Sequence, residues 1–166
     1  MLTGAQTRRV RGAGLSLEVA EMGDPTRPSV LLLHGYPDTK AVWKDVATRL
    51  AERFHVIAYD VRGAGASDAP ADPGAYRLTD LSADLSAVLD AVAPDRRVHL
   101  VGHDWGSVQG WAFAADPAIA PRLASFTSIS GPPLDHIGAW FATGLGRPDP
   151  VRWAAMAEQA CRSWYV

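Results

Sequence analysis

The sequence predicts an α/β fold, in which helices cover both faces of a mostly parallel β-sheet. Four short runs of apolar residues recur along the chain, as expected of strands that are buried on both faces of a sheet. Segments with the periodicity of amphipathic helices separate these runs. Strands and helices that alternate in this way favour parallel pairing, because each helix carries the chain back across one face of the sheet.

The chain is expected to begin with a hairpin and then to alternate between strands and helices. The predicted elements are two short strands within residues 10–21, buried strands at 29–35, 54–60, 97–103 and 123–130, helices at 40–53, 79–92 and 106–116, and a long loop at 61–76. In the first helix, Val42, Val46 and Leu50 recur every four residues and predict an apolar face. Thr79 is the predicted N-cap of the second helix, and Pro117 ends the third.

The composition is that of a globular domain whose partners are small molecules. The chain has 166 residues and a formal net charge of -2, without the basic cluster that nucleic acid or an anionic membrane would require. No apolar run has the length of a signal peptide or a membrane span, and Cys161 is the single cysteine, so we expect a cytoplasmic location. Scattered histidines predict no metal site, and no Gly-x-Gly-x-x-Gly fingerprint predicts a nicotinamide cofactor. The oligomeric state stays open.

The character of the sequence changes after Ser130. The predicted strands all precede this point, whereas the residues that follow contain aromatic-rich helical stretches separated by glycine and proline. We therefore expect the N-terminal part of a core at residues 1–132 and an incomplete helical region at 133–166.

Asp104 lies at a sharp connection between a predicted strand and a helix. It is the central residue of "GHDWG", and the small residues Gly102 and Gly106 allow the strand and the helix to approach closely. The apex residue of such a turn adopts a strained backbone conformation and points beyond the carboxyl end of the sheet, where open α/β sheets bind ligands. The alternative is that Asp104 only caps the following helix, as aspartate often does.

The segment "HGYPD", residues 34–38, follows another predicted strand and is expected to face the same crevice. Gly35 lets the chain turn, and Pro37 is a candidate for a cis peptide bond. The backbone N–H of Tyr36 then points into the crevice, and the N–H of Trp105 at a helix N-terminus adds a second donor to an oxyanion hole. The alternative is an ordinary loop between a strand and a helix.

Other polar residues in the predicted strands and loops are interpreted as structural. Asp60, Arg62 and Ser67 belong to a glycine-rich loop after a buried strand. His55 and His99 alternate with apolar residues inside strands, which is typical of sheet or surface positions.

Three segments in this order, "HGYPD", "DVRGAGASD" and "GHDWGS", resemble the α/β-hydrolase superfamily, and more narrowly its epoxide hydrolase branch. The resemblance covers nearly all of the chain and implies an α/β-hydrolase fold that stops at the start of the lid. Haloalkane dehalogenases share the pair Asp104–Trp105 but usually carry Asn where this chain has Tyr36. Fluoroacetate-type dehalogenases usually carry Arg at the position of Trp105, and esterases need serine at the position of Asp104. Residues 123–140 look similar to a subgroup in which a short-chain dehydrogenase domain follows the hydrolase domain.

The resemblance implies a reaction at a saturated carbon of a small apolar epoxide. A carboxylate is ionised near neutral pH, so Asp104 needs no base to attack the epoxide and form an ester. Water then attacks the ester carbonyl, and the backbone N–H groups of Tyr36 and Trp105 stabilise the oxyanion. The residues predicted to contact substrate are His34, Pro37, Trp140, Phe141 and Trp164.

The family also implies catalytic groups that this sequence does not show. Tyr165 matches by position the first lid tyrosine, which protonates the departing oxygen; the alternative is a tyrosine that only packs. The histidine and the second acidic residue of the family lie beyond the lid, and no histidine here stands at a matching position. We therefore expect a chain that carries the nucleophile but is incomplete as an enzyme.

Three functions stay open from the sequence. The first is an epoxide hydrolase-like hydrolase, and the second is a haloalkane dehalogenase-like hydrolase. The third is a truncated, non-catalytic chain that binds apolar ligands through Trp140, Phe141, Trp153 and Trp164.

Overall fold

The computed structural model describes residues 4–146 and 149–162. The chain divides into two compact units, Met1–Gly131 and Pro132–Val166, and each unit is described by itself.

The first unit contains a six-stranded sheet in the order β1-β2-β4-β3-β5-β6. Its strands are β1 (Gln6–Arg11), β2 (Ser16–Met22), β3 (Ser29–Leu33), β4 (His55–Tyr59), β5 (Val98–His103) and β6 (Leu123–Ile129). The strands β1 and β2 form an antiparallel hairpin, and β2 pairs antiparallel with β4. The pairs β3–β4, β3–β5 and β5–β6 are parallel, so the predicted mostly parallel sheet is confirmed.

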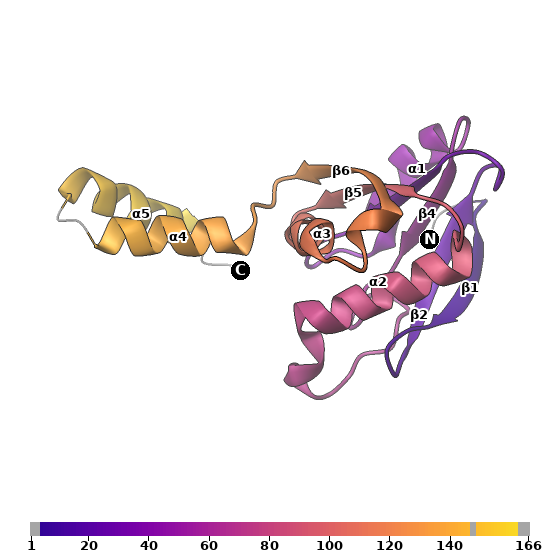
Figure 1. The fold of residues 1–166 in the computed structure, drawn as a ribbon, viewed down its shortest axis with the longest axis horizontal. Coiled ribbons are helices and arrows are strands. Elements are labelled where there is room, and N and C mark those ends of the chain that lie inside the picture. The colour runs from indigo at the N-terminus through magenta and orange to yellow at the C-terminus, as the bar shows by residue number, and fades with distance from the viewer. Residues whose placement is uncertain (1–3, 147–148, 163–166) are drawn as a thin grey trace. The chain divides into compact units, whose positions relative to one another are not determined.

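Helices cover both faces of this sheet, as predicted (Figure 1). The helices of the unit are α1 (Lys44–Leu50), α2 (Leu78–Val92) and α3 (Trp105–Ala115), with short 3-10 helices η1 (Lys40–Trp43), η2 (Pro73–Tyr76) and η3 (Ala120–Arg122). Alternate residues of β3 show the division: Leu31 and Leu33 pack with α2 and α3, whereas Val30 and Leu32 pack with η1 and α1. The core is therefore two apolar layers on either side of one sheet.

The predicted apolar face of the first helix is wrong at Val42 and Val46, whereas Leu50 is partly buried and packs against the core, as predicted. Val42 and Val46 are 47% and 43% exposed, whereas Trp43 and Ala47 are buried against the sheet. The helical segment begins as the 3-10 helix η1 and continues as α1, and its buried face is formed by Trp43, Ala47 and Leu50 at helical spacing.

The predicted N-cap of the second helix is also wrong. The residue before α2 is Arg77, which has an extended backbone, and no side chain caps the helix there. Thr79 lies inside the first turn, because the helix starts one residue earlier, at Leu78. The residues of α2 that face the core recur at helical spacing: Leu85, Val88, Leu89 and Val92 are buried.

The last strand, β6, is less buried than the sequence predicts. It lies at the end of the strand order and pairs only with β5 among the described strands. Leu123 is buried, Phe126 is half-buried, and the remaining residues of β6 are exposed. Phe126 packs edge to face on Trp111 of α3, with ring centroids 5.2 Å apart.

The second unit is a pair of packed helices, α4 (Leu134–Leu145) and α5 (Pro150–Arg162). Met156 is buried and fills the space over Gly144, and the Trp153 indole N–H donates to the Gly144 carbonyl at 3.1 Å. In the part of the chain that the structure describes, no helix is both long enough and apolar enough to span a membrane.

Candidate active site

Asp104 lies between the end of β5 and the start of α3, in the strained backbone conformation that the sequence predicts. Its φ is 54° and its ψ is -124°, and it is one of two non-glycine residues with positive φ in the described chain. Close packing explains the two flanking glycines. A Cβ on Gly102 would overlap the backbone at Gly106, and a Cβ on Gly106 would overlap the Leu33 carbonyl.

The carboxylate of Asp104 does not cap the helix that follows it. The backbone carbonyl of Asp104 accepts the N–H groups of Ser107 and Val108, and the side chain makes no capping hydrogen bond. Instead, Asp104 Oδ1 accepts the backbone N–H of Tyr36 at 2.9 Å. The carboxylate is therefore bound to the loop at residues 34–38 and not to the first turn of α3.

The loop that supplies this N–H fits closely against the carboxylate. A Cβ on Gly35 would overlap Asp104 Oδ1, so only glycine allows this approach. The Tyr36–Pro37 peptide bond is cis. The Tyr36 side chain is 69% exposed, so the loop presents its backbone to Asp104 and its side chain to solvent.

Trp105 is the first residue of α3. The N–H groups in the first turn of a helix have no acceptor within the helix, and they carry the positive end of its dipole. The second predicted donor is therefore next to Asp104 in the chain and is not used by the helix.

His34, which the sequence assigns to substrate binding, is buried. Its Nδ1–H donates to the Gly35 carbonyl at 2.8 Å, and its Nε2 accepts the Val61 N–H at 3.1 Å. Burial lowers the pKa of His34 below its ordinary value, in agreement with a neutral ring that donates from one nitrogen and accepts at the other. Both ring nitrogens are engaged within the protein, so His34 holds the loop in place.

The loop after β4 has the structural role that the sequence predicts. Asp60 forms a buried ion pair with Lys40, with 2.5 Å between Oδ2 and Nζ, and Ser67 donates to the Asp60 carbonyl. Burial raises the pKa of Asp60, but the Ala66 N–H and the bonds from Lys40 outweigh it and hold the pKa below its ordinary value. Arg62 forms a second buried ion pair, with Asp84 of α2.

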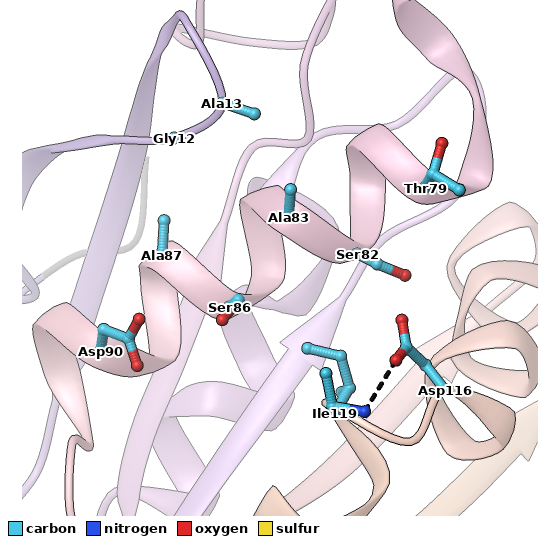
Figure 2. Close-up of a pocket in the computed structure, with 11 residues that line it drawn as sticks. Gly12, Ala13, Thr79, Ser82, Ala83, Ser86, Ala87, Asp90, Asp116 and Ile119 are labelled. Atoms are coloured by element: carbon cyan, nitrogen blue, oxygen red, sulfur yellow. Dashed lines mark hydrogen bonds between the residues drawn. The ribbon is translucent and has the colours of Figure 1, made fainter.

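The groove over α2 is not part of this site (Figure 2). It has a volume of about 540 Å³ and is open to solvent. Its lining is Gly12, Ala13, Thr79, Ser82, Ala83, Ser86, Ala87, Asp90, Asp116, Ala118 and Ile119. The Asp90 carboxylate pairs with Arg122, and the Asp116 carboxylate accepts the Ala118 N–H, so both acidic groups are engaged.

A family profile described as the alpha/beta hydrolase fold matches residues 28–154. The chain belongs to this α/β-hydrolase fold family.

Several relatives within the family are named epoxide hydrolases. The chain is 41% identical to epoxide hydrolase A of Mycobacterium tuberculosis over 133 residues, which are 79% of this chain and 40% of that protein. It is 42% identical to the probable oxidoreductase EphD of the same organism over 135 residues, which are 81% of this chain and 23% of that protein. The crystal structure of epoxide hydrolase A from Mycobacterium thermoresistibile matches with a TM-score of 0.68 and 34% identity, over 74% of this chain and 38% of that one. The chain thus spans less than half the length of each.

The aromatic residues that the sequence assigns to substrate binding are not in the first unit of this α/β hydrolase. Trp140 and Phe141 lie on α4 of the second unit and pack edge to face, with ring centroids 4.9 Å apart. Trp164 and Tyr165 lie outside the described residues. Pro37 is exposed on the loop next to Asp104.

Sequence reasoning missed the hydrogen bonds between the turn at Asp104 and the residues at the end of β6. The Asp104 N–H donates to the Ile129 carbonyl at 2.9 Å. The Gly131 carbonyl accepts hydrogen bonds from Ser107, Ser128 and the Trp111 indole N–H. Ser107 and Trp111 carry no local signal of this role, because their acceptor is a backbone carbonyl 24 and 20 residues away in the chain.

Proposed function

We propose that this chain supplies the nucleophile of an epoxide hydrolase and that Asp104 is that nucleophile. The observation that carries the proposal is the Asp104 carboxylate, which lies at a strained apex and accepts the Tyr36 N–H at 2.9 Å. Relatives named epoxide hydrolases support the class of reaction. In this proposal the substrate is a small apolar epoxide, and residues 133–166 begin a helical lid.

The first step forms an ester on Asp104. One carboxylate oxygen attacks a ring carbon, a new C–O bond forms, and the ring C–O bond breaks with its electrons on the epoxide oxygen. That oxygen takes a proton from an acid, the role that we propose for Tyr165. The Tyr36 N–H on Oδ1 orients the carboxylate, so that the other oxygen faces the substrate.

The second step hydrolyses this ester. A base takes one proton from water as the water oxygen adds to Cγ of Asp104, and the negative charge develops on the carbonyl oxygen that faces the N–H groups of Tyr36 and Trp105. Collapse of this intermediate breaks the bond between Cγ and the substrate oxygen, which takes the proton from the base and completes the diol. The remaining carboxyl proton returns to the acid of the first step, which restores the carboxylate. Loss of one donor in such an oxyanion hole typically lowers the rate on the order of 100- to 1000-fold.

We further propose that the 166-residue polypeptide accumulates the ester. Water needs a general base for the second step, and three histidines of the first unit already make hydrogen bonds within the protein. His34 and His99 make hydrogen bonds within the sheet region, and His55 contacts Ser29 and Glu21. The His103 ring packs edge to face on Trp43.

The test is incubation of the polypeptide with styrene oxide, followed by intact mass and peptide mapping. Cys161 is exposed and also reacts with epoxides, so all variants carry Cys161→Ser. We expect one added styrene oxide, located on Asp104, and no addition at this position in Asp104→Asn. Labelling elsewhere but not on Asp104 would refute the nucleophile, and sustained diol formation would refute the accumulation of the ester.

A further inference from the structure

The loop that carries the Tyr36 N–H is bound at both ends to two consecutive residues, Asp60 and Val61. At its start, His34 Nε2 accepts the Val61 N–H at 3.1 Å. At its end, Lys40 makes two bonds to the Asp60 carboxylate: its backbone N–H donates to Oδ1 at 2.8 Å and its Nζ to Oδ2 at 2.5 Å. The Tyr36 N–H lies between these two attachments.

The attachment at Lys40 is a buried ion pair, which is unusual for lysine. The side chains of Lys40 and Asp60 are 9% and 2% exposed. Removal of one partner from a buried pair leaves the other charge uncompensated, so these two groups hold each other much more strongly than a surface pair would.

Asp60 is itself fixed from the other side. Its Oδ2 accepts the Ala66 N–H at 2.9 Å, and its backbone carbonyl accepts the Ser67 hydroxyl at 2.5 Å. The carboxylate lies so close to Gly65 that a Cβ there would overlap it. Lys40 is therefore bound to a group that cannot follow it if the loop moves.

Gly35 packs against Asp104, but the two residues that follow it have little packing of their own. Tyr36 is 69% exposed and Pro37 is also exposed, so apolar burial does not fix the position of this segment. The place of the Tyr36 N–H relative to Asp104 therefore depends on the attachments at the two ends of the loop.

We propose that Lys40 and Asp60 are positioning residues for the Tyr36 N–H, and thus for the reactive carboxylate of Asp104. This inference rests on the proposed function, since it assigns these residues through the oxyanion donor. Neither residue touches substrate in this proposal.

The first test uses the unaltered chain and measures hydrogen exchange at single amides by NMR. If the loop is held as one body, the Tyr36 and Lys40 amides open together and exchange with the same free energy of opening. Exchange at Tyr36 that is much faster than at Lys40 would overturn the proposal. This measurement needs no substitution and does not depend on reactivity at Asp104.

The second test compares Lys40→Met, which keeps the apolar stem, with Lys40→Arg, which keeps the charge. With styrene oxide we expect Lys40→Met to slow labelling of Asp104 on the order of 100-fold, as displacement of a reacting group does, and to speed exchange at the Tyr36 amide. Lys40→Arg should restore most of the labelling rate of Asp104 and most of the protection of the Tyr36 amide. Leu89→Ala is the control, because it removes buried apolar volume from α2 and lowers stability without touching this loop.

The outcomes separate this proposal from the proposed function. The positioning role would be overturned if Lys40→Met left the labelling of Asp104 and the exchange of the Tyr36 amide unchanged. It would also be overturned if Leu89→Ala lost as much labelling and amide protection as Lys40→Met. An unaltered chain that is not labelled at Asp104 would overturn the nucleophile instead, and the exchange comparison would still decide whether the loop is held as one body. If Lys40→Met does not fold, that comparison in the unaltered chain decides alone.

Discussion

Asp104 combines a strained backbone with a carboxylate that is held by another loop. A positive φ costs on the order of 1–3 kcal/mol at a non-glycine residue and persists only where surrounding contacts enforce it. Here those contacts are the close approach at Gly102 and Gly106 and the hydrogen bond from the Asp104 N–H to Ile129. The chain thus maintains an unfavourable conformation at the one residue whose side chain we propose to react.

Gly35 allows the first prediction, because it is the residue against which the carboxylate packs. In Gly35→Ala the new methyl group would overlap Asp104 Oδ1, so the carboxylate or the loop must move. We expect labelling of Asp104 by styrene oxide to fall on the order of 100-fold. Gly138→Ala on α4 is the matched control, since a Cβ there meets no other atom within 4 Å. A wild-type rate in Gly35→Ala would contradict the close approach.

His34 gives a prediction about pH. Its pKa is lowered by burial in the folded state, so the unfolded chain takes up the proton first as the pH falls. The stabilisation from neutral His34 is therefore present above the unfolded pKa of about 6.5 and is lost as the pH falls through the lower folded pKa. Urea unfolding at pH 7.5 and 5.5 measures this effect: the free energy of unfolding should fall less between the two pH values in His34→Gln than in the unaltered chain. An equal loss in both would contradict this role.

At the scale of the elements, the start of α2 lacks a feature that helices commonly have. Arg77 has φ -72° and ψ 153°, the extended backbone of an N-cap, but makes no capping bond. Several N–H groups of the first turn therefore depend on backbone acceptors or water.

Arg77→Ser should therefore stabilise the chain by about 1 kcal/mol, because serine caps helices without adding a charge next to Asp80. Urea unfolding at neutral pH measures this change. Thr79→Ala is the control, and its effect should stay within about 0.5 kcal/mol, since Thr79 lies inside the turn. A larger loss of stability in Thr79→Ala would show instead that Thr79 caps the helix.

The same scale shows why some elements could be predicted and others could not. The central strands could be predicted from continuous apolar runs. The turn at Asp104 could be predicted from glycines at positions where a side chain would not fit. Both signals are local in the sequence. Val42 and Val46 recur at the same spacing as Trp43 and Ala47, so the spacing alone does not tell which pair faces the sheet. The burial of Lys40 depends on Asp60, which is 20 residues away, and no periodicity records such a partner.

At the scale of the whole molecule, the order of the strands decides which of them are covered. The sequence predicts β6 as a buried strand because its run is apolar, but burial is set by the neighbours of a strand and not by its composition. In the described part of the chain, β6 pairs on one side only. Its exposed backbone groups are then free to pair with another chain.

The polypeptide should therefore self-associate through β6, and a charge there should reduce this. Thr127 is exposed, and Thr127→Lys places a charge on the strand, as natural edge strands often do. Light scattering at equal concentrations should show less association than in the unaltered chain. Thr48→Lys on the exposed side of α1 adds the same charge elsewhere and should not have this effect. Equal scattering in the two variants would contradict a role of the strand.

The Gly131 carbonyl, with its three side-chain donors, has a consequence for protein engineering. It fixes the last residue of the first unit directly against the Asp104 turn, and Ser130, with φ 57°, sets the direction in which the chain leaves the sheet. The first unit thus ends at a residue that is hydrogen-bonded to α3, and Pro132 opens the next unit. This boundary is a natural splice point: foreign helical segments can be joined after Gly131, so that libraries of exchanged second units share one unchanged Asp104 turn.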